Sequence, residues 1–363
     1  MRIAIDARLY GIHHRGIGRY LSELISTLAQ IGVNDEFVLL VDPRNPQQPI
    51  NLPKNFCTHF VSASVYTLSE QFAVTAALKQ IKPDIIHFPH FSVPFFTPSP
   101  FIVTVHDLIL HHFPEERATT LPSFIYYFKL QVYKKIISRA IARARRVIVP
   151  SQTVADDIVN YYPLSKTKII IIPLAPGTSA LADETQVPKF PYILVVGAAY
   201  PHKNLDKAIE AVVVARRELP NHKLLIVGRN DYFMNRLKYQ CHKAGINESI
   251  HFFGQADDST LTALYKNADC YLQVSLMEGF GLGPLESLQN GTPAIVANIP
   301  IFREVLGSAV TYVNPLSATE IAQAVVSVCK KIPSSVDARA ILKKYSWTNT
   351  ATATLEAYHN AIV

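Results

Sequence analysis

The chain has 363 residues, of which 49% are hydrophobic and 17% charged, and its formal net charge is +7. This length exceeds one ordinary core and predicts two domains of about 150 to 200 residues each, and the composition excludes a disordered chain. The four scattered cysteines form no metal-binding spacing and no disulfide framework, which favours a reducing cytoplasm, and no apolar run approaches the roughly 18 residues of a membrane span.

The first half of the chain alternates short apolar runs with helical patterns, which predicts βαβ units and a parallel sheet. The expected strands are Arg2–Asp6, Glu36–Val41, Phe56–Val61, Asp84–Phe88, Phe101–His106, Arg146–Pro150 and Lys168–Ile172. The expected helices are Leu21–Ile31, Ser69–Ile81, Pro122–Arg145 and Thr153–Tyr161. A polar, irregular stretch from Ala175 to Pro191 follows, and we interpret it as a linker between domains.

A glycine-containing loop follows the first expected strand and opens the next helix, with the sequence Arg15-Gly16-Ile17-Gly18-Arg19-Tyr20. Small residues let the backbone approach an anion, and a helix N-terminus attracts negative charge. Gly16 and Gly18 are therefore candidates for binding a diphosphate, although a tight turn into a helix would use the same residues. Arg19 could reach the phosphates or lie on the helix surface.

Two expected strand exits in the first half carry histidines. His106 follows one strand, and the carboxyl end of a parallel strand is where ligand-binding residues lie. A neutral histidine there can hydrogen-bond a sugar hydroxyl, and a satisfied histidine at a strand exit is the alternative. His87 and His90 belong to the preceding exit. Core or supporting roles are favoured for both, and an acceptor pocket is the alternative.

The stretch from Arg117 to Ala155 carries eight basic residues and no acid, interleaved with aromatic side chains. The basic residues are Arg117, Lys129, Lys134, Lys135, Arg139, Arg143, Arg145 and Arg146. Such a helical stretch favours contact with an anionic membrane surface or, equally, a solvated helix face whose aromatic side chains point to the core. No recognition module accompanies it, which argues against nucleic acid.

The strand pattern restarts in the second half of the chain. The expected strands are Tyr192–Gly197, Lys223–Gly228, Ile250–Gly254, Asp269–Val274 and Pro293–Ala297, and a helical pattern follows from Ser346 to Ile362. Two Rossmann-like halves predict ligands at the carboxyl ends of both sheets, with a cleft between the domains. The expected division is residues 1–175, 190–345 and 346–363.

Residues 278–286 read Glu278-Gly279-Phe280-Gly281-Leu282-Gly283-Pro284-Leu285-Glu286, two carboxylates eight apart around a glycine-rich turn. The flanking patterns predict a strand before the turn and a helix over Leu285–Gly291, which places Glu286 near the helix start. Turn N–H groups and the positive helix end suit polyhydroxyl or phosphate oxygens. Acids that only complement the helix dipole are the alternative, but that role needs one acid and no Gly-x-Gly-x-Gly.

This segment resembles the E-x7-E signature of retaining nucleotide-sugar glycosyltransferases, above all glycosyltransferase family 4. The Gly16–Tyr20 loop, His106, Lys203-Asn204-Leu205 and Phe253–Leu261 are similar to further motifs of the family, so the resemblance covers nearly the whole chain. It implies an α/β fold of the GT-B type, with two Rossmann-like domains facing across a cleft. It also implies that the C-terminal helix crosses back onto the first domain.

The resemblance implies roles for residues around the turn. Glu278 would contact the donor sugar, and Glu286 would bind the ribose hydroxyls. The backbone amides of Phe280, Gly281 and Leu282 would hold sugar hydroxyls.

Further roles follow for the loops before this turn. Lys203 would carry the charge of the diphosphate, and His202 stands where the family commonly has an arginine, a gap that Arg229 could fill. Ala256 and Leu261 would sandwich the base. We interpret Asp258 as the N-cap of a helix that starts near Ser259, outside the site.

The chain is therefore expected to be a retaining, metal-independent hexosyltransferase of polysaccharide or glycan biosynthesis that needs no cofactor; no Asp-x-Asp occurs in it. UDP-glucose is slightly favoured as donor over GDP-mannose, and the acceptor would be a carbohydrate or lipid-linked glycan. The expected location is the cytoplasm, with attachment to the inner membrane face as an alternative.

Two rival functions belong to other classes. A dinucleotide-binding oxidoreductase would need a third glycine where this chain has Leu21. A non-catalytic sugar- or lipid-binding scaffold would not need Lys203, Glu278 and Glu286.

Overall fold

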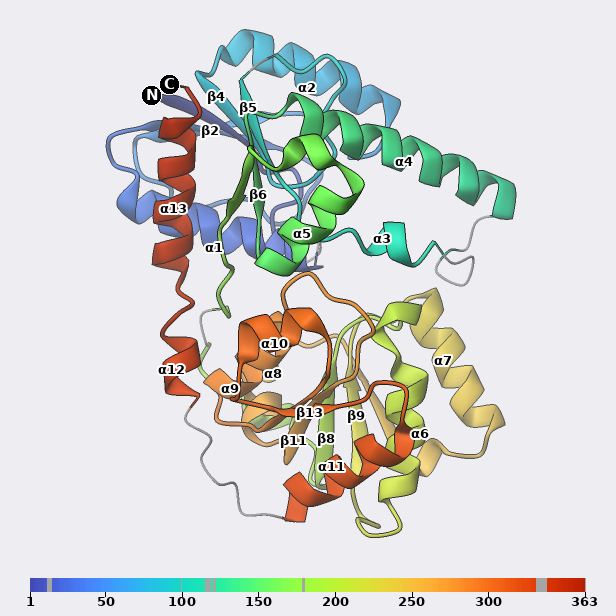
Figure 1. The fold of residues 1–363 in the computed structure, drawn as a ribbon. Coiled ribbons are helices and arrows are strands. Elements are labelled where there is room, and N and C mark those ends of the chain that lie inside the picture. Colours follow the sequence, from blue (N-terminus) through green and yellow to red (C-terminus); the bar gives the residue numbers. More distant parts are fainter. Residues whose placement is uncertain are drawn as a thin grey trace. The chain divides into compact units, whose positions relative to one another are not determined.

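The chain folds into two compact units (Figure 1), which the computed structural model describes for residues 1–11, 15–98, 100–114, 119, 122–177, 180–330 and 338–362. Unit 1 comprises Met1–His112, Ser123–Ala175 and Tyr345–Val363, and unit 2 comprises Phe113–Pro122 and Pro176–Lys344. Unit 1 is therefore built from segments that lie far apart in the sequence.

Unit 1 contains a seven-stranded parallel sheet in the order β3-β2-β1-β4-β5-β6-β7. Its strands are β1 (Arg2–Asp6), β2 (Glu36–Val41), β3 (Phe56–Phe60), β4 (Ile85–Phe88), β5 (Phe101–Thr104), β6 (Arg146–Val149) and β7 (Ile169–Ile171). Its helices are α1 (Arg15–Ile31), α2 (Leu68–Ile81), α3 (Ile109–His112), α4 (Ser123–Arg143), α5 (Gln152–Tyr161) and α13 (Trp347–Asn360).

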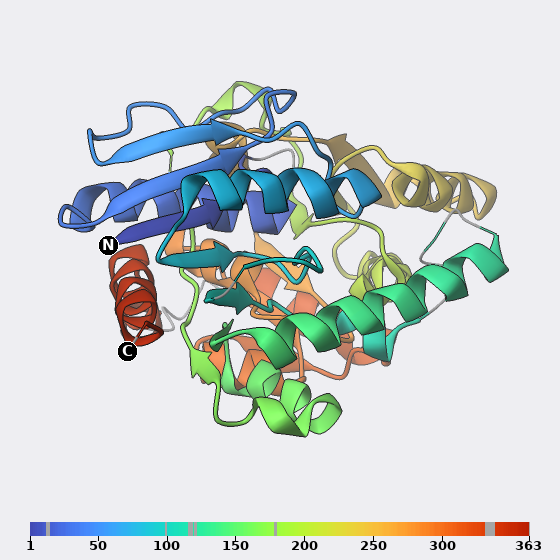
Figure 2. The same ribbon diagram turned by 90° about the horizontal axis from the view of Figure 1, so that it is seen from above.

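The two faces of this sheet are covered by different helices. Alternate strand side chains, such as Ala4 and Val38, share one core with residues of α2, α4 and α5. The helices α1 and α13 pack against each other, as Figure 2 shows from above. The last helix is anchored by buried contacts, because the Tyr358 hydroxyl lies 2.7 Å from Nδ1 of His87 and Thr350 donates to the carbonyl of Pro173 at 2.7 Å.

Unit 2 contains a six-stranded parallel sheet in the order β10-β9-β8-β11-β12-β13. Its strands are β8 (Tyr192–Val196), β9 (Lys223–Val227), β10 (Ile250–Gly254), β11 (Cys270–Gln273), β12 (Ala294–Ala297) and β13 (Thr311–Val313). Its helices are α6 (Leu205–Ala215), α7 (Tyr232–Lys243), α8 (Asp258–Lys266), α9 (Leu282–Gln289), α10 (Pro300–Leu306), α11 (Ala318–Lys330) and α12 (Arg339–Leu342).

The predicted α/β class with parallel sheets is confirmed, and the expected strands agree with the observed ones within two residues at each end. Two helices begin several residues earlier than expected, α1 at Arg15 and α9 at Leu282. The stretch interpreted as a linker contains the boundary between the two units, because Ala175 belongs to unit 1 and Pro176 to unit 2. Within unit 2 the Asp183 N–H donates to the Ser259 carbonyl at 3.2 Å and a short 3₁₀ turn (Glu184–Gln186) packs on α8.

None of the helices in the described part of the chain is long and apolar enough to cross a membrane.

Candidate functional site

The strand order of unit 2 brings two loops of the predicted site together. β8 pairs with β9 on one side and with β11 on the other, where Cys270 lies beside Ile193 and Tyr271 beside Leu194. The chain therefore leaves β8 and β11 in different directions at the same sheet edge, and such a point in an open α/β sheet is where ligands bind. Lys203 lies on the loop after β8, and Glu278 lies on the loop after β11.

Lys203 and Glu278 form an ion pair at this edge. The ammonium nitrogen lies 2.7 Å from Oε1 and 2.8 Å from Oε2 of the carboxylate, and the side chains are 25% and 9% exposed. Burial opposes the charged form of Glu278, but the attraction and hydrogen bonds of Lys203 outweigh it and hold the pKa of Glu278 below its usual range. The carboxylate is therefore ionised at neutral pH.

The loop that carries Lys203 is fixed by the residue after it. Asn204 adopts a left-handed backbone conformation with φ of 56°, and its side-chain amide donates to the carbonyls of Val274 at 3.0 Å and Pro315 at 2.7 Å. The N–H of Leu276 also donates to the carbonyl of His202 at 2.8 Å. These bonds hold the two loops of the site against each other.

A run of polar side chains connects the ion pair with Glu286. The amide of Gln273 donates to Glu278 at 2.5 Å, and the hydroxyl of Tyr271 donates to Gln273 at 2.6 Å. The hydroxyl of Tyr265 donates to Oε2 of Glu286 at 3.1 Å, and its ring lies 5.6 Å from that of Tyr271. Burial, followed by the charges of both glutamates, raises the pKa of Tyr271. The two glutamates of the sequence motif therefore lie around one buried tyrosine.

The glycine-rich turn is shaped by close packing. Gly281 caps α9 with φ of 96°, and a Cβ there would lie 2.6 Å from the ring of Phe302. A Cβ on Gly283 would overlap the hydroxyl of Tyr271. Phe280 is buried beside them. Glycine is therefore needed at both positions, because the backbone lies against the side chains of Phe302 and Tyr271. The turn places the N-terminus of α9 at the edge of the sheet.

Glu286 lies in the second turn of α9, because this helix begins at Leu282. The expectation that Glu286 stands near the helix start was wrong by about one turn. The helix dipole acts mainly within the first turn, so the buried carboxylate is held by Tyr265 and its other contacts more than by the dipole.

The other candidates of unit 2 lie at the exits of β9 and β10 or on α8. Arg229 is exposed, Ala256 and Leu261 are half-buried, and the described chain shows no hydrogen bond or ion pair that joins them to Lys203 or Glu278. The N-cap of α8 is Asp257, which accepts from the N–H of Thr260 at 2.8 Å, so the assignment to Asp258 was wrong by one residue.

His202, next to Lys203, is neutral at physiological pH. Burial, aided by the nearby charge of Lys203, lowers its pKa to about 4. It therefore cannot replace the fixed charge of an arginine at this position.

In unit 1 the two glycines of the first loop have different surroundings. A Cβ on Gly18 would overlap the carbonyl of Gly11, so Gly18 is required for the loop to pack on α1. A Cβ on Gly16 would meet open space. Packing explains Gly18, and nothing in the local structure requires Gly16.

His106 lies at the exit of β5 and is neutral. Burial lowers its pKa to about 4, its Nε2 lies 3.0 Å from the carbonyl of Pro89, and its ring meets Tyr20 edge-on at 4.9 Å. Because a carbonyl only accepts, Nε2 carries the hydrogen and Nδ1 is left as an acceptor. This tautomer suits a hydroxyl donor.

The other two candidate histidines of unit 1, His87 and His90, have different surroundings. His87 is fully buried between Tyr358 and Thr104, whose hydroxyl lies 2.8 Å from Nε2, so it is a core residue, as favoured from the sequence. Nδ1 of His90 lies 3.0 Å from the hydroxyl of Tyr66. Burial lowers the pKa of both histidines to about 3.

A buried ion network in unit 1 was not predicted. The guanidinium of Arg8 lies 2.6 Å from Asp6 and 2.6 Å from Glu70, and it donates to the carbonyl of Ala63 at 3.1 Å. Asp6 and Glu70 are far apart in the sequence, so their common contact with Arg8 could be predicted only from the arrangement of β1 and α2 in the fold. The network fixes the loop after β1 at the carboxyl edge of the sheet.

Five of the eight basic residues lie on α4, namely Lys129, Lys134, Lys135, Arg139 and Arg143. Arg145 follows this helix and Arg146 begins β6, whereas Arg117 lies outside the described residues. The aromatic side chains of α4 are divided between core and solvent. Tyr126 is buried, whereas Phe124 is 75% and Phe128 70% exposed. The interpretation that the aromatic side chains point to the core therefore holds for Tyr126 but not for Phe124 and Phe128, and contact with a membrane surface stays a prediction.

No group of three or more His, Cys, Asp or Glu side chains placed to hold a metal ion occurs in the part of the chain that the structure describes.

Sequence comparisons match both halves of the chain. The family described as "Glycosyltransferase Family 4" matches residues 14–175, and the one described as "Glycosyl transferases group 1" matches residues 180–345. The O-antigen chain mannosyltransferase RfbU of Salmonella typhimurium is 30% identical over 69% of this chain and 66% of its own length. The O-antigen chain mannosyltransferase B of Escherichia coli is 23% identical over 94% of this chain and 95% of its own.

Among solved structures, a sucrose-phosphate synthase from Thermosynechococcus elongatus superimposes with a TM-score of 0.76 at 17% identity. The match covers 99% of this chain and 98% of that one. Because the sequence identity is only 17%, this similarity shows a shared fold.

Proposed function

This chain belongs to the glycosyltransferases of group 1 and family 4, with the GT-B fold, and from that premise we propose that it moves a hexose from a nucleoside diphosphate sugar to a carbohydrate acceptor with retention of configuration. One observation carries the proposal. Lys203 and Glu278 form an ion pair at the switch point of the second sheet, and the side chains of Gln273, Tyr271 and Tyr265 lead from this pair to Glu286. A scaffold without donor chemistry has no need for such a buried, charged network.

In the proposed reaction, the bond between the sugar's anomeric carbon and the diphosphate breaks, and the diphosphate keeps the electron pair. Lys203 stabilises the negative charge that develops on this leaving group. The acceptor hydroxyl attacks from the same face, and its proton passes to the leaving phosphate oxygen. Glu278 is bound by Lys203 and Gln273, which suits a ligand of the donor sugar more than a nucleophile.

His106 would take part as a neutral hydrogen-bond acceptor. Its Nε2 hydrogen is used by Pro89, so Nδ1 can accept from a hydroxyl of the sugar. Because its pKa is lowered to about 4, this role persists at neutral pH. Transfer without a metal ion remains part of the proposal.

The donor is proposed to be GDP-mannose, with UDP-glucose as the second candidate. The sequence slightly favours UDP-glucose, whereas the two curated relatives above are named mannosyltransferases.

The names of these relatives also support a growing glycan of the O-antigen kind as the acceptor. If this acceptor is bound to a membrane, the exposed aromatic residues of α4 would suit contact with that membrane. Phe124, Tyr127 and Phe128 are 75%, 47% and 70% exposed and share this helix with several lysines and arginines, a combination that favours an anionic lipid surface.

A panel of nucleotide sugars tests this proposal. A donor at about a hundred times its dissociation constant should stabilise the protein by about 2.7 kcal/mol, which thermal unfolding detects. The stabilising donor is then incubated with glycan acceptors, and the anomeric configuration of the product is read by NMR. Stabilisation by GDP-mannose with transfer of mannose and retention supports the proposal. Binding without transfer to any acceptor would favour the scaffold, and an inverted product would contradict the mechanism.

A further inference from the structure

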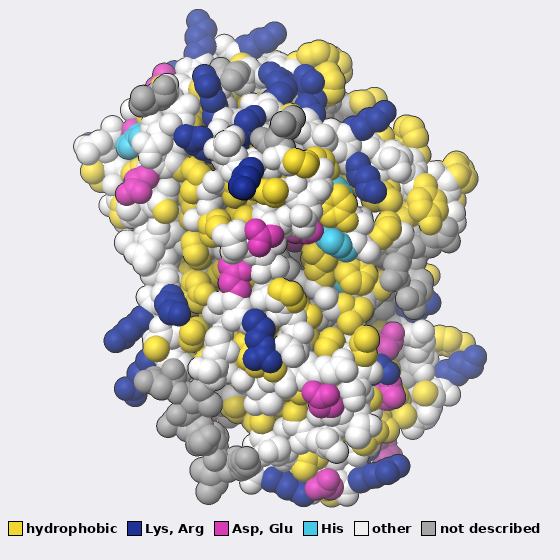
Figure 3. Space-filling view, in the orientation of Figure 1, with side chains coloured by type: hydrophobic (Ala, Val, Ile, Leu, Met, Phe, Trp, Pro, Cys, Tyr) yellow, Lys and Arg dark blue, Asp and Glu magenta, His cyan; other side chains and the backbone are white. Residues whose placement is uncertain are grey.

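Tyr265 and Tyr271 are two neighbouring buried tyrosines of unit 2, and each leads to a different glutamate of the site. Their rings lie 5.6 Å apart and are 2% and 1% exposed. On the face drawn in Figure 3, Lys and Arg side chains are scattered over the surface, whereas Glu278 and Glu286 are each only 9% exposed. Because a buried carboxylate must be hydrogen-bonded, the groups that bond to it also fix its direction.

The hydrogen bonds that lead from Tyr271 to Glu278 all run in one direction. A carboxylate only accepts, so the amide of Gln273 must turn Nε2 toward Glu278, where it lies 2.5 Å from Oε1. Oε1 of Gln273 then faces the hydroxyl of Tyr271, which donates to it at 2.6 Å. Burial, followed by the charges of both glutamates, raises the pKa of Tyr271, so this hydroxyl keeps its proton and remains a donor.

Lys203 does not set the direction of the Glu278 carboxylate by itself. Its ammonium group lies 2.7 and 2.8 Å from the two carboxylate oxygens, but it is a compact charge on a flexible stem with rotatable donors. The amide of Gln273 is planar and is bonded at both ends. The orientation of the carboxylate therefore depends on Gln273 and, through it, on Tyr271.

The backbone of α9 keeps the tyrosine and the amide in place. A Cβ on Gly283 would overlap the hydroxyl of Tyr271 and would lie 2.9 Å from Oε1 of Gln273. The hydrogen bond between these two side chains therefore lies directly against the first turn of α9, which leaves no room for it to rearrange on that side.

The hydroxyl of Tyr265 bonds to the other glutamate. Tyr265 lies on α8 and donates to Oε2 of Glu286 at 3.1 Å, whereas Tyr271 lies on β11. The two tyrosines therefore come from different elements and act on different carboxylates.

We propose that Tyr271, acting through Gln273, is a positioning residue that orients Glu278 toward the donor sugar, and that Tyr265 positions Glu286 toward the nucleotide. The inference rests on the proposed function for the identity of the ligands. Its consequence is a division of roles. Loss of the Tyr271 hydroxyl should weaken recognition of the sugar, and loss of the Tyr265 hydroxyl should weaken recognition of the nucleotide.

Calorimetry on the intact protein separates the two roles. Dissociation constants are measured for the nucleotide sugar that stabilises the parent and for its free nucleoside diphosphate, and the ratio of the first to the second isolates the sugar. Tyr271→Phe and Gln273→Met should each raise this ratio about tenfold, because the carboxylate loses one charge-assisted hydrogen bond, while the free diphosphate binds as to the parent. Tyr265→Phe should weaken both ligands by a similar factor, and a raised ratio in this variant would overturn the division of roles.

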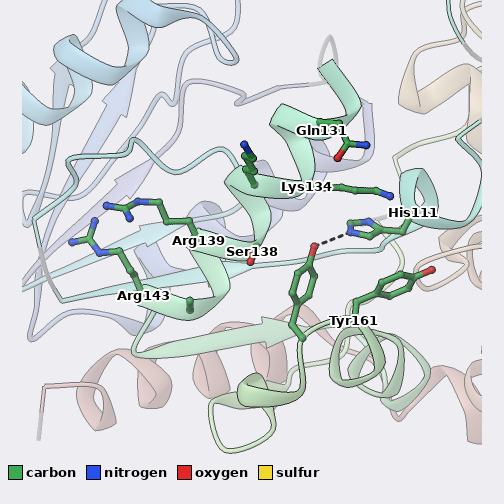
Figure 4. A pocket seen from close by; sticks show the side chains of 10 residues that line it. His111, Gln131, Lys134, Ser138, Arg139, Arg143 and Tyr161 are labelled. Carbon is green, nitrogen blue, oxygen red and sulfur yellow. Dashed lines mark hydrogen bonds between the residues drawn. The ribbon is translucent and has the colours of Figure 1, made fainter. Parts of the chain in front are cut away.

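Two matched variants control for structural effects. Tyr192→Phe removes an equally buried hydroxyl, which donates to the carbonyl of Leu264 at 2.8 Å, and should lower the melting temperature while the ratio stays that of the parent. Gln131→Met removes an exposed amide of α4, at the pocket between α4 and α5 in unit 1 (Figure 4), and should change neither quantity. A raised ratio in either control would show that a general loss of stability moves it, and would overturn the proposal.

A double variant tests whether Tyr271 acts through Gln273. Tyr271→Phe combined with Gln273→Met should raise the ratio no more than Gln273→Met alone, because the hydroxyl then has no amide to direct. Effects that multiply would show independent roles and overturn the action through Gln273. An unchanged ratio in both single variants would overturn the positioning of Glu278.

Unfolding without ligand distinguishes a failure of this inference from a failure of the proposed function. If no nucleotide sugar binds the parent, the proposed function is wrong, but the hydrogen bonds to Glu278 are still measurable. The stability lost in Tyr271→Phe and Gln273→Met should shrink as the pH falls below about 4.3, because Glu278 becomes protonated, whereas the loss in Tyr192→Phe should not depend on pH. A loss that is independent of pH in all three variants would overturn the inference.

Discussion

At the scale of single residues, the two glutamates of the motif are held by different kinds of partner. Glu278 is paired with the ammonium group of Lys203, whereas the hydroxyl of Tyr265 donates to Glu286. Lys203 is therefore bound by a carboxylate in this structure. Under the proposed function, a diphosphate that binds Lys203 would share the ammonium group with Glu278, so we expect Glu278 to affect the affinity for the donor.

Glu286→Gln should weaken nucleotide binding without unfolding the protein. The amide oxygen can still accept from Tyr265, but a charge-assisted bond to the ribose hydroxyls would be lost, which costs about 1.5–3 kcal/mol, or roughly ten- to 150-fold in affinity. Titration calorimetry with GDP and UDP measures the change. Glu356→Gln, at an exposed position of α13, is the control and should bind as the parent does. An unchanged dissociation constant in Glu286→Gln would remove this residue from the site.

Lys203→Met should destabilise the protein because it leaves the buried carboxylate of Glu278 without its cation. Since Lys203 is a quarter exposed, the expected loss is about 1–3 kcal/mol in urea unfolding, less than for a fully buried pair. Glu278→Gln added to this variant should restore part of the loss. Turnover at saturating donor should also fall, and transfer at the parent rate would contradict the role of Lys203.

The same pair predicts a pH dependence. Lys203 lowers the pKa of Glu278 in the folded state, so the pair contributes stability above the ordinary pKa of a glutamate, near 4.3, and loses it as the pH falls through the lower folded value. The stability difference between the parent and Lys203→Met should therefore shrink as the pH is lowered below about 4.3.

At the scale of elements, the two glycines at the start of α1 can be used to separate the effect of close packing from that of ligand binding. Gly18→Ala would force a Cβ onto the carbonyl of Gly11 and should destabilise the protein by about 1–3 kcal/mol. Gly16→Ala meets open space and should gain up to about 1 kcal/mol from helix propensity. If Gly16 lies against a diphosphate, Gly16→Ala should lose transfer activity while its melting temperature is retained. Full activity in this variant would show that Gly16 does not contact the donor.

Three strands were predicted with their observed bounds, β1, β2 and β10, because each is mainly a short apolar run. The early start of α9 was missed because Gly281, Gly283 and Pro284 read as helix breakers, although proline is tolerated in the first turn. β13 has only three residues at the sheet edge, too few for a pattern. For the site, the sequence could identify single residues with suitable chemistry. It could not identify pairs that are far apart in the chain and come into contact only in the folded protein, such as His87 and Tyr358.

At the scale of the whole molecule, the proposed activity draws on residues of both units. Lys203, Glu278 and Glu286 belong to unit 2, and Gly16 and His106 belong to unit 1. We therefore expect most of the residues that bind the nucleotide to belong to unit 2. Residues of unit 1 are expected to bind the sugar and the acceptor.

His106→Ala should spare the affinity for free nucleotide and reduce sugar transfer sharply. Both quantities are measured on one preparation, by calorimetry and by product formation at saturating donor. His242→Ala, at an exposed position of α7, is the control and should change neither. A large loss of nucleotide affinity in His106→Ala, or unaltered transfer, would contradict the assignment of roles to the two units.

The return of α13 to unit 1 has a consequence for synthesis on the ribosome. The ribosome synthesises all of unit 2 before it adds Tyr345, the first residue of the returning segment. Until Tyr358 arrives, His87 of β4 lacks the hydroxyl that it bonds in the finished core. The first unit in the sequence is thus the last to be completed. We expect the nascent chain to keep this part of its core unfinished while the second unit is synthesised at roughly 5–20 residues per second.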